Sequence, residues 1–173
     1  HPDNSSAATL GGITAAFCES GEVHALQVVS HMTVGVALFI PDAPLPTVEA
    51  RAILPEQVPI ADAIHNIGHS AYLIAALTWG RLDHIGAAMR DRLHQPYRTR
   101  LIPALQDVIA AAVDAGAYGA ALSGGGPSVI ALGPRNQIDA IASAMESRAH
   151  DVDWRGCSIV SQIRARGVQV KEE

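Results

Sequence analysis

Hydrophobic positions near the start of the chain fall into short runs of the kind that form strands. Three such runs, rich in apolar and β-branched residues and bounded by turn residues, predict strands at residues 13–18, 26–29 and 33–40. A helix is expected before them, because Asp3 and Asn4 are good N-caps and Gly11-Gly12 provides a stop. The Pro-rich stretch at residues 41–46 interrupts regular structure.

The middle of the chain changes to helical spacing. Apolar residues recur every three or four positions up to about Trp79 and form one stripe along a predicted helix, made of Ile60, Ile64, Ile67, Ala71 and Ile74. Shorter helices are predicted at residues 47–51, 82–89 and 101–112. Gly80 and Gly116 follow two of these segments and end them.

The last third of the chain returns to strands. Two apolar runs, residues 118–122 and 128–132, flank a glycine-rich loop, and an amphipathic helix begins at Ile138. Final strands are predicted at residues 157–163 and 168–170, joined across Arg166-Gly167. Strands and helices interleave without strict βαβ alternation. The order therefore predicts an α+β fold, with helices packed on one face of a largely antiparallel sheet.

Composition narrows the class of protein. The 173 residues are 49% hydrophobic and 17% charged, which fits one domain, or one domain with a piece of another. A net charge of −5 argues against a nucleic-acid partner, since binding phosphates requires a basic surface. The longest apolar run, residues 34–40, is too short to cross a bilayer. We therefore expect neither a nucleic-acid nor a membrane partner.

Cysteine and histidine give little sign of a metal or disulfide centre. Cys18 and Cys157 are far apart and form no Cys-x-x-Cys motif, so we expect two reduced core thiols in a cytoplasmic protein. His65 and His69 are spaced to meet on one helix face, but the glutamate of a His-Glu-x-x-His zinc site is absent. We predict no metal site from these residues.

The start of the chain suggests that it is a fragment. It begins with His1 rather than Met, directly inside a patterned segment, and shows no signal-peptide pattern. We expect a domain boundary near residues 30–33, with residues 1–31 as the end of one domain and residues 32–173 as a second.

The glycine-rich loop is the strongest chemical signal. Three consecutive glycines, Gly124, Gly125 and Gly126, join two apolar strands between Ser123 and Ser128. Such a run is entropically costly, but it lets backbone N–H groups converge in a nest that binds anions. A plain strand connection is the alternative.

Two further features suit recognition of a small anion. His1-Pro2-Asp3-Asn4 lies at a predicted helix start, where free amides and the helix dipole favour negative charge, although Asp3 is equally suited to a simple cap. Arg51 and Arg98 each lie near a proline, and guanidinium groups bind carboxylate or phosphate with two hydrogen bonds. Taken singly, each arginine is also typical of a solvated surface.

Together these motifs resemble the latter half of homoserine kinases, within the GHMP kinase superfamily. The likeness covers nearly the whole chain in the family's order: His1-Pro2-Asp3-Asn4 with Gly11-Gly12, Thr47-x-Glu49-Ala50-Arg51, Ile64-His65-Asn66, Gln95-Pro96-Tyr97-Arg98, and the loop from Ser123 to Ser128. The loop is typical of the superfamily, and the other motifs are more specific. The resemblance implies a ferredoxin-like C-terminal domain preceded by the remnant of an N-terminal domain of the ribosomal protein S5 domain 2 type.

The resemblance also implies roles for matching residues. His1, Asp3, Asn4, Arg51, Arg98 and Gly124 would bind L-homoserine, the two arginines through its α-carboxylate. Thr47 would lie near the reacting hydroxyl, as the one residue placed at the catalytic position. Ser123, Gly125, Gly126 and Ser128 would support the phosphate-binding loop of the other domain. The implied reaction is ATP-dependent phosphorylation of L-homoserine to O-phospho-L-homoserine in threonine biosynthesis.

One departure from the family matters. Its ATP loop, a Pro-x-x-x-Gly-Leu-Gly-Ser-Ser-Ala run, does not occur in this sequence, and the acid expected to hold Mg²⁺ would also lie upstream. We therefore expect the fragment alone to be inactive, with the main ATP and Mg²⁺ contacts outside it. A homodimer is compatible with the family. The alternatives are another GHMP small-molecule kinase and a stand-alone amino-acid-binding module with a ferredoxin-like sheet.

Overall fold

The computed structural model describes residues 2–29 and 32–170, which form two compact units. One unit comprises His1–Thr33 and Gln162–Glu173, and the other comprises Val34–Ser161. Across the described ranges, no helix is long and apolar enough to cross a membrane.

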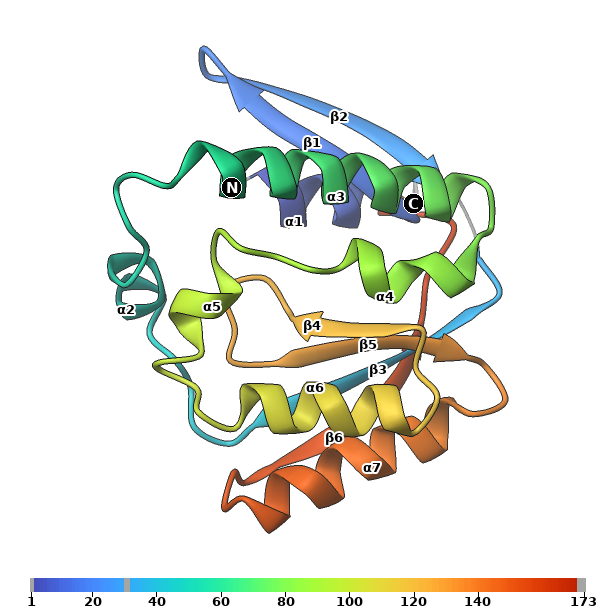
Figure 1. Cartoon of the computed structure of the whole chain (residues 1–173). Coiled ribbons are helices and arrows are strands. Elements are labelled where there is room, and N and C mark those ends of the chain that lie inside the picture. The colour runs from blue at the N-terminus through green and yellow to red at the C-terminus, as the bar shows by residue number, and fades with distance from the viewer. Residues whose placement is uncertain (1, 30–31, 171–173) are drawn as a thin grey trace. The chain divides into compact units, whose positions relative to one another are not determined.

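The first unit is a helix and a hairpin. Helix α1 (Pro2–Leu10) precedes the antiparallel strands β1 (Ile13–Glu19) and β2 (Glu22–Val29), as the sequence predicts (Figure 1). The turn at Ser20 and Gly21 has positive φ at both residues, and Phe17 stacks on His24 across the hairpin with ring centroids 4.8 Å apart.

The predicted strand at residues 168–170 is wrong. These residues pair with no strand in the described chain; the Val168 amide instead donates to the carbonyl of Ala8 at 2.9 Å. Gly167 does not form a hairpin turn, because it lies against the backbone of Thr9, where an added Cβ would come within 2.1 Å of the carbonyl oxygen. Glycine is required there for close approach of two backbones.

The second unit contains a four-stranded sheet in the order β4-β5-β3-β6. Its strands are β3 (Val34–Pro41), β4 (Gly119–Leu122), β5 (Val129–Pro134) and β6 (Gly156–Gln162), the last extending one residue into the other unit. Strand β5 is antiparallel to both β3 and β4, with Ala131 opposite Ala37 and Ala120. With α6 (Leu105–Asp114) after β3 and α7 (Ile138–Asp151) after β5, this is the βαββαβ ferredoxin-like arrangement.

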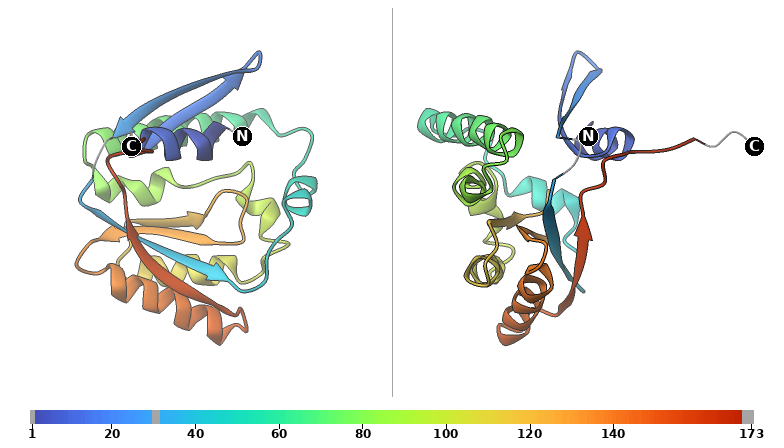
Figure 2. Two further views of the ribbon diagram at one scale, coloured as in Figure 1. Left: turned by 180° about the vertical axis from the view of Figure 1, so that it is seen from behind. Right: turned by 90° about the vertical axis from the view of Figure 1, so that its right-hand side faces the viewer.

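Helices α6 and α7 lie side by side on one face of the sheet (Figure 2). Their apolar sides meet the sheet residues that point the same way, so the core combines Ala37, Phe39, Leu105, Val108, Val129, Ala131, Ile141 and Met145, all with essentially no exposed surface. The ring of Trp154 meets Phe39 edge-on, with centroids 4.9 Å apart. Burial of this apolar surface is the main stabilising term of the unit.

The remaining helices lie between β3 and α6 in the chain. They are α2 (Thr47–Ala52), α3 (Ile60–Thr78), the 3₁₀ turn η1 (Leu82–His84), α4 (Ile85–Ala88) and α5 (Gln95–Arg98). Helix α4 packs against β4, and α3 packs against α4. One prediction needs correction: α6 begins at Leu105 rather than Leu101, because Pro103 disfavours helix in the residue before it. The α5 turn was not predicted.

The cysteine prediction is wrong in one respect. Cys18 and Cys157 are free thiols, but both are exposed rather than in the core. Cys18 lies on the two-stranded hairpin, and Cys157 lies on a strand whose outward residues are not covered. Burial of a small apolar side chain depends on what covers the strand, which a strand pattern alone does not specify.

Candidate functional site

The short helix α5 presents the only buried arginine of the described chain. Pro96 occupies one of its first two positions, where the fixed φ of proline suits a helix start. The amide of Arg98 donates to the carbonyl of His94 at 3.1 Å, and the amide of Thr99 donates to that of Gln95 at 2.9 Å. Arg98 is 8% exposed.

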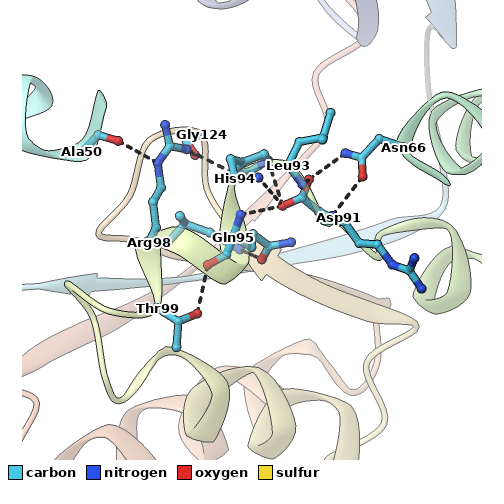
Figure 3. A network of polar contacts seen from close by, with 11 residues as sticks. Ala50, Asn66, Asp91, Leu93, His94, Gln95, Arg98, Thr99 and Gly124 are labelled. Atoms are coloured by element: carbon cyan, nitrogen blue, oxygen red, sulfur yellow. Dashed lines mark hydrogen bonds and ion pairs between the residues drawn. The ribbon is translucent and has the colours of Figure 1, made fainter. Parts of the chain in front are cut away.

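The guanidinium of Arg98 is held on three sides (Figure 3). Nε donates to the carbonyl of Ala50 at 3.1 Å, and Nη1 faces both the carbonyl of Gly124 and Nδ1 of His94, each at 3.1 Å. A guanidinium has five N–H groups, and these contacts use three. Within the described part of the chain, the two N–H groups of Nη2 make no hydrogen bond, so they remain for a ligand.

The electrostatics of Arg98 favour an anion. Burial lowers its pKa from the ordinary arginine value, and the positive charge of Arg51 lowers it further, while the Asp91 carboxylate opposes the shift. Arginine nevertheless stays protonated in proteins. A carboxylate placed between Arg51 and Arg98 would relieve their repulsion and replace the water that Arg98 has lost.

The glycine-rich loop lies directly beside Arg98. The amide of Ser123 donates to the carbonyl of Ser128 at 2.8 Å, and the amide of Gly126 donates to that of Ser123 at 3.0 Å, so two loop amides are used within the loop. The amides of Gly124 and Gly125 make no hydrogen bond within residues 2–29 and 32–170. A Cβ on either of these two glycines would meet no atom within 4 Å. The loop therefore offers two free donors on an unobstructed surface.

The predicted site residues of the second unit lie on three elements. Arg51 is exposed in the last turn of α2, directly after Ala50, whose carbonyl binds Arg98. Thr47 is the exposed first residue of the same helix. The structure thus brings Arg98, Gly124 and the end of α2 together.

The remaining predicted residues belong to the first unit. Asp3 and Asn4 are exposed in the first turn of α1. His1 lies outside the described residues. The participation of all three in the site stays a prediction.

Two residues of the network, Asp91 and His94, were not singled out from the sequence, and Asn66 and Gln95 were named there only within motifs, without a role. Asp91 accepts hydrogen bonds from the Asn66 side chain and from three backbone amides that lead into α5, and the Gln95 side-chain oxygen accepts from the amide of Leu122 (Figure 3). The N-cap residue of α5 is His94, so a capping pattern does not mark Asp91; its bond to the amide of Leu93, two residues on, is an Asx turn, which aspartate favours.

A hollow of about 510 Å³ adjoins the same turn. Asp91 and Gln95 line it, together with His65, whose ring stacks on His69 at 3.8 Å as their spacing predicts. Arg51, Arg98 and Gly124 are not among its lining residues, so this hollow is distinct from the arginine site.

Comparison with known proteins identifies the family. Residues 52–151, more than half of the chain, match the family GHMP kinases C terminal. The chain belongs to the GHMP kinase family. This GHMP kinase chain is 44% identical to homoserine kinase from Caldicellulosiruptor bescii over 79% of its own length and 44% of the relative's. It is 45% identical to homoserine kinase from Gloeobacter violaceus over 85% of this chain and 49% of the relative. The chain therefore spans about half the length of the curated relatives it matches.

Two solved kinase structures confirm the fold. Homoserine kinase from Cytophaga hutchinsonii superimposes with a TM-score of 0.90 at 29% identity, over 96% of this chain and 53% of that one. Mevalonate kinase from L. major superimposes with a TM-score of 0.69 at 19% identity, over 92% of this chain and 52% of that one. This similarity concerns the fold alone. The α+β, ferredoxin-like prediction is confirmed.

Proposed function

We propose that this chain carries the amino-acid-binding half of a homoserine kinase. The enzyme transfers the γ-phosphoryl group of ATP to the side-chain hydroxyl of L-homoserine and releases O-phospho-L-homoserine. The observation that carries the proposal is buried Arg98, whose two remaining N–H groups lie beside the end of α2 and the glycine-rich loop. The homoserine kinase relatives at 44% and 45% identity support the choice of substrate.

The α-carboxylate of homoserine is the group that the two arginines recognise. Arg98 is fixed by its three contacts and donates from Nη2, and exposed Arg51 contributes a second positive charge. Gly124 lets the substrate approach the loop backbone, since no side chain obstructs it. That His1, Asp3 and Asn4 also bind the amino acid, as the resemblance to the family implies, is part of the proposal.

The reacting end of the substrate lies toward Thr47 and the glycine-rich loop. We propose Thr47 as the residue near the hydroxyl that receives the phosphoryl group, as the resemblance to the family implies. The loop supports the phosphate-binding segment of the other half through Ser123, Gly125, Gly126 and Ser128. Phosphoryl transfer has a loose transition state, so the main task of these residues is to align the hydroxyl and to stabilise charge.

ATP supplies the phosphoryl group, and Mg²⁺ screens its charge. We place their main contacts in the part of the relatives' length that this chain does not span. The chain's own contribution is then to bind and orient the amino acid. We further propose that the enzyme acts in threonine biosynthesis in the cytoplasm and that it is compatible with a homodimer.

The test is an ADP-release assay on two polypeptides. One is the 173-residue chain alone, and the other is the same chain joined to an upstream half like that of its relatives. We expect ADP and O-phospho-L-homoserine, identified by mass spectrometry, only from the joined polypeptide with L-homoserine. ADP production by the chain alone would refute its dependence on a second half. Preference for mevalonate over L-homoserine would make it a different GHMP kinase, and homoserine binding without turnover would make it a binding module.

A further inference from the structure

Asp91 is the most highly connected side chain near the arginine site (Figure 3). Its Oδ1 accepts from the Asn66 side-chain amide at 2.7 Å and from the amide of Leu93 at 2.9 Å, and its Oδ2 accepts from the amides of His94 at 3.0 Å and Gln95 at 2.5 Å. Four donors thus fill the four acceptor directions of one carboxylate. The turn that leads into α5 has little freedom to move around it.

The charge of Asp91 is maintained although its side chain is only 8% exposed. Burial opposes ionisation, but the hydrogen bonds from Asn66 and from the three backbone amides outweigh it and hold the pKa of Asp91 below its ordinary value. A buried, fully hydrogen-bonded carboxylate fixes local geometry strongly, because loss of any partner leaves an unsatisfied charge. Its function in this turn is positional, since the described chain leaves it no free acceptor.

His94 connects this turn to the arginine. Its Nδ1 lies 3.1 Å from Nη1 of Arg98, and its Nε2 lies 3.7 Å from Oδ2 of Asp91. A guanidinium can only donate, so Nδ1 must accept, and the proton of the neutral ring must sit on Nε2, on the side of the carboxylate. The ring therefore orients Arg98 only when it is neutral.

We propose that Asp91 and His94 are positioning residues that together aim the Arg98 guanidinium at the substrate carboxylate. Asp91 fixes the turn that sets α5, and His94 fixes the direction of the guanidinium beside Gly124. The choice of an amino-acid substrate rests on the proposed function, whereas the geometry of the three side chains does not. Neither positioning residue is required to contact the substrate.

The arrangement gives substrate binding a defined dependence on pH. A protonated His94 carries N–H groups at both nitrogens and can no longer accept from Arg98. Burial lowers the pKa of His94 below 6.5, with Arg98 adding to this and Asp91 opposing it, so the ring is neutral at pH 7. The charged groups that act on it are the Asp91 carboxylate and the Arg98 guanidinium, and Arg51 in turn acts on Arg98. KM for the amino acid should therefore rise as the pH falls through the pKa of His94.

Two substitutions at one position separate the hydrogen bond from the titration. His94→Asn keeps an acceptor oxygen near the position of Nδ1 but cannot titrate, and His94→Leu removes the acceptor. In the joined polypeptide, we expect His94→Leu to raise KM for L-homoserine about tenfold with little change in kcat. His94→Asn should keep KM near that of the unsubstituted enzyme at pH 7.5 and abolish its rise at low pH. His24→Asn, an exposed histidine on β2, is the matched control and should change neither.

Asp91→Asn tests the other member of the pair. The amide replaces one acceptor oxygen with a donor that faces backbone N–H groups, so we expect KM to rise at least tenfold with a smaller effect on kcat. Asp83→Asn, at an exposed aspartate, is the control. If both positioning residues act through Arg98, their effects on KM should largely disappear in an Arg98→Ala background, whereas a general loss of fold would not depend on Arg98.

A structural measurement keeps this inference separate from the proposed substrate. Nitrogen NMR of the 173-residue chain should show His94 neutral with its proton on Nε2, and a slowly exchanging Arg98 Nε–H that exchanges faster in His94→Leu. These signals are expected whether or not the chain takes part in phosphorylation of homoserine. A proton on Nδ1 of His94, or an unchanged Arg98 signal in His94→Leu, would overturn the positioning role. Absence of activity with normal NMR signals would refute only the proposed function.

Discussion

Helices α5 and α6 are neighbours in the sequence but are held in place by different forces. Helix α6 is fixed by Leu105, Val108 and Ala112, which have essentially no exposed surface and pack under the sheet. Helix α5 spans only Gln95–Arg98 and is fixed by hydrogen bonds to groups on α2, β4 and the glycine-rich loop. Apolar contact tolerates small shifts, whereas oriented hydrogen bonds do not. We infer that α6 sets stability and that α5 sets the geometry of the site.

Leu105→Ala is the change that should most strongly distinguish the two helices. Leu105 is completely buried where α6 meets the sheet, so truncation leaves a cavity as well as losing apolar contact. We expect the free energy of unfolding of the 173-residue chain to fall by about 3–5 kcal/mol in urea denaturation. Val113→Ala, at a 47% exposed position of the same helix, is the control and should cost less than about 1 kcal/mol. Equal losses at the two positions would contradict the assignment of the core.

The core of the second unit could be predicted from the sequence because apolar packing leaves a recognisable pattern of hydrophobic residues along the chain. Strand β3 was expected at residues 33–40 and is found at Val34–Pro41, and α7 begins at the expected Ile138. Helix α7 buries one side, so its apolar residues recur at helical spacing, whereas β3 is buried along almost its whole length and appears as a continuous apolar run. The prediction of a strand at residues 168–170 was wrong, because two valines in a short run cannot specify a partner strand.

The site could be predicted only in part. Arg98 and Gly124 were singled out, and they are in contact. Asp91 and His94 were not, because their contacts are hydrogen bonds, most of them to residues two to four positions away, and such bonds leave no apolar periodicity. Helix α5 is a single turn, too short for an apolar stripe. Its position follows from partners such as Asn66 and Leu122, which only the folded chain brings near it.

Arg98→Lys tests whether binding at α5 depends on the geometry of the Arg98 hydrogen bonds rather than on positive charge alone. Lysine keeps the positive charge but has one nitrogen, which cannot reproduce the contacts to Ala50, Gly124 and His94 at once. We expect the binding free energy of L-homoserine to weaken by about 2–3 kcal/mol in calorimetry of the joined polypeptide. Arg100→Lys, at an exposed arginine two residues away, should leave it unchanged. Normal affinity in Arg98→Lys would mean that charge alone suffices.

Gly126→Ala tests the place where the hydrogen-bonded site meets the apolar core. This glycine has φ of +83° and lies between the glycine-rich loop and the core residue Leu122. An added Cβ would come within 2.9 Å of the Leu122 side chain, which can move aside, but the positive φ remains unfavourable for alanine. We expect a loss of about 1–2 kcal/mol in the free energy of unfolding. Gly125→Ala meets no neighbour and has no positive φ, so its stability should be nearly unchanged. A larger loss at Gly125 would mean that the loop packs differently.

Ile64→Ala is expected to have the smallest effect on the free energy of unfolding. It tests whether a regular apolar stripe on a helix is sufficient to predict that the helix is buried. The stripe of α3 is as regular as that of α6, yet Ile60, Ile64 and Ile67 are 76%, 63% and 71% exposed. Alanine also has the higher helix propensity, so the free energy of unfolding of the 173-residue chain should stay within about 0.5 kcal/mol. Comparison with the joined polypeptide adds the decisive control. If the additional half covers this stripe, Ile64→Ala should destabilise the joined form by about 1 kcal/mol or more while leaving the chain alone unaffected. The same substitution with no effect in either form would show that a stripe as regular as that of a core helix can remain in solvent.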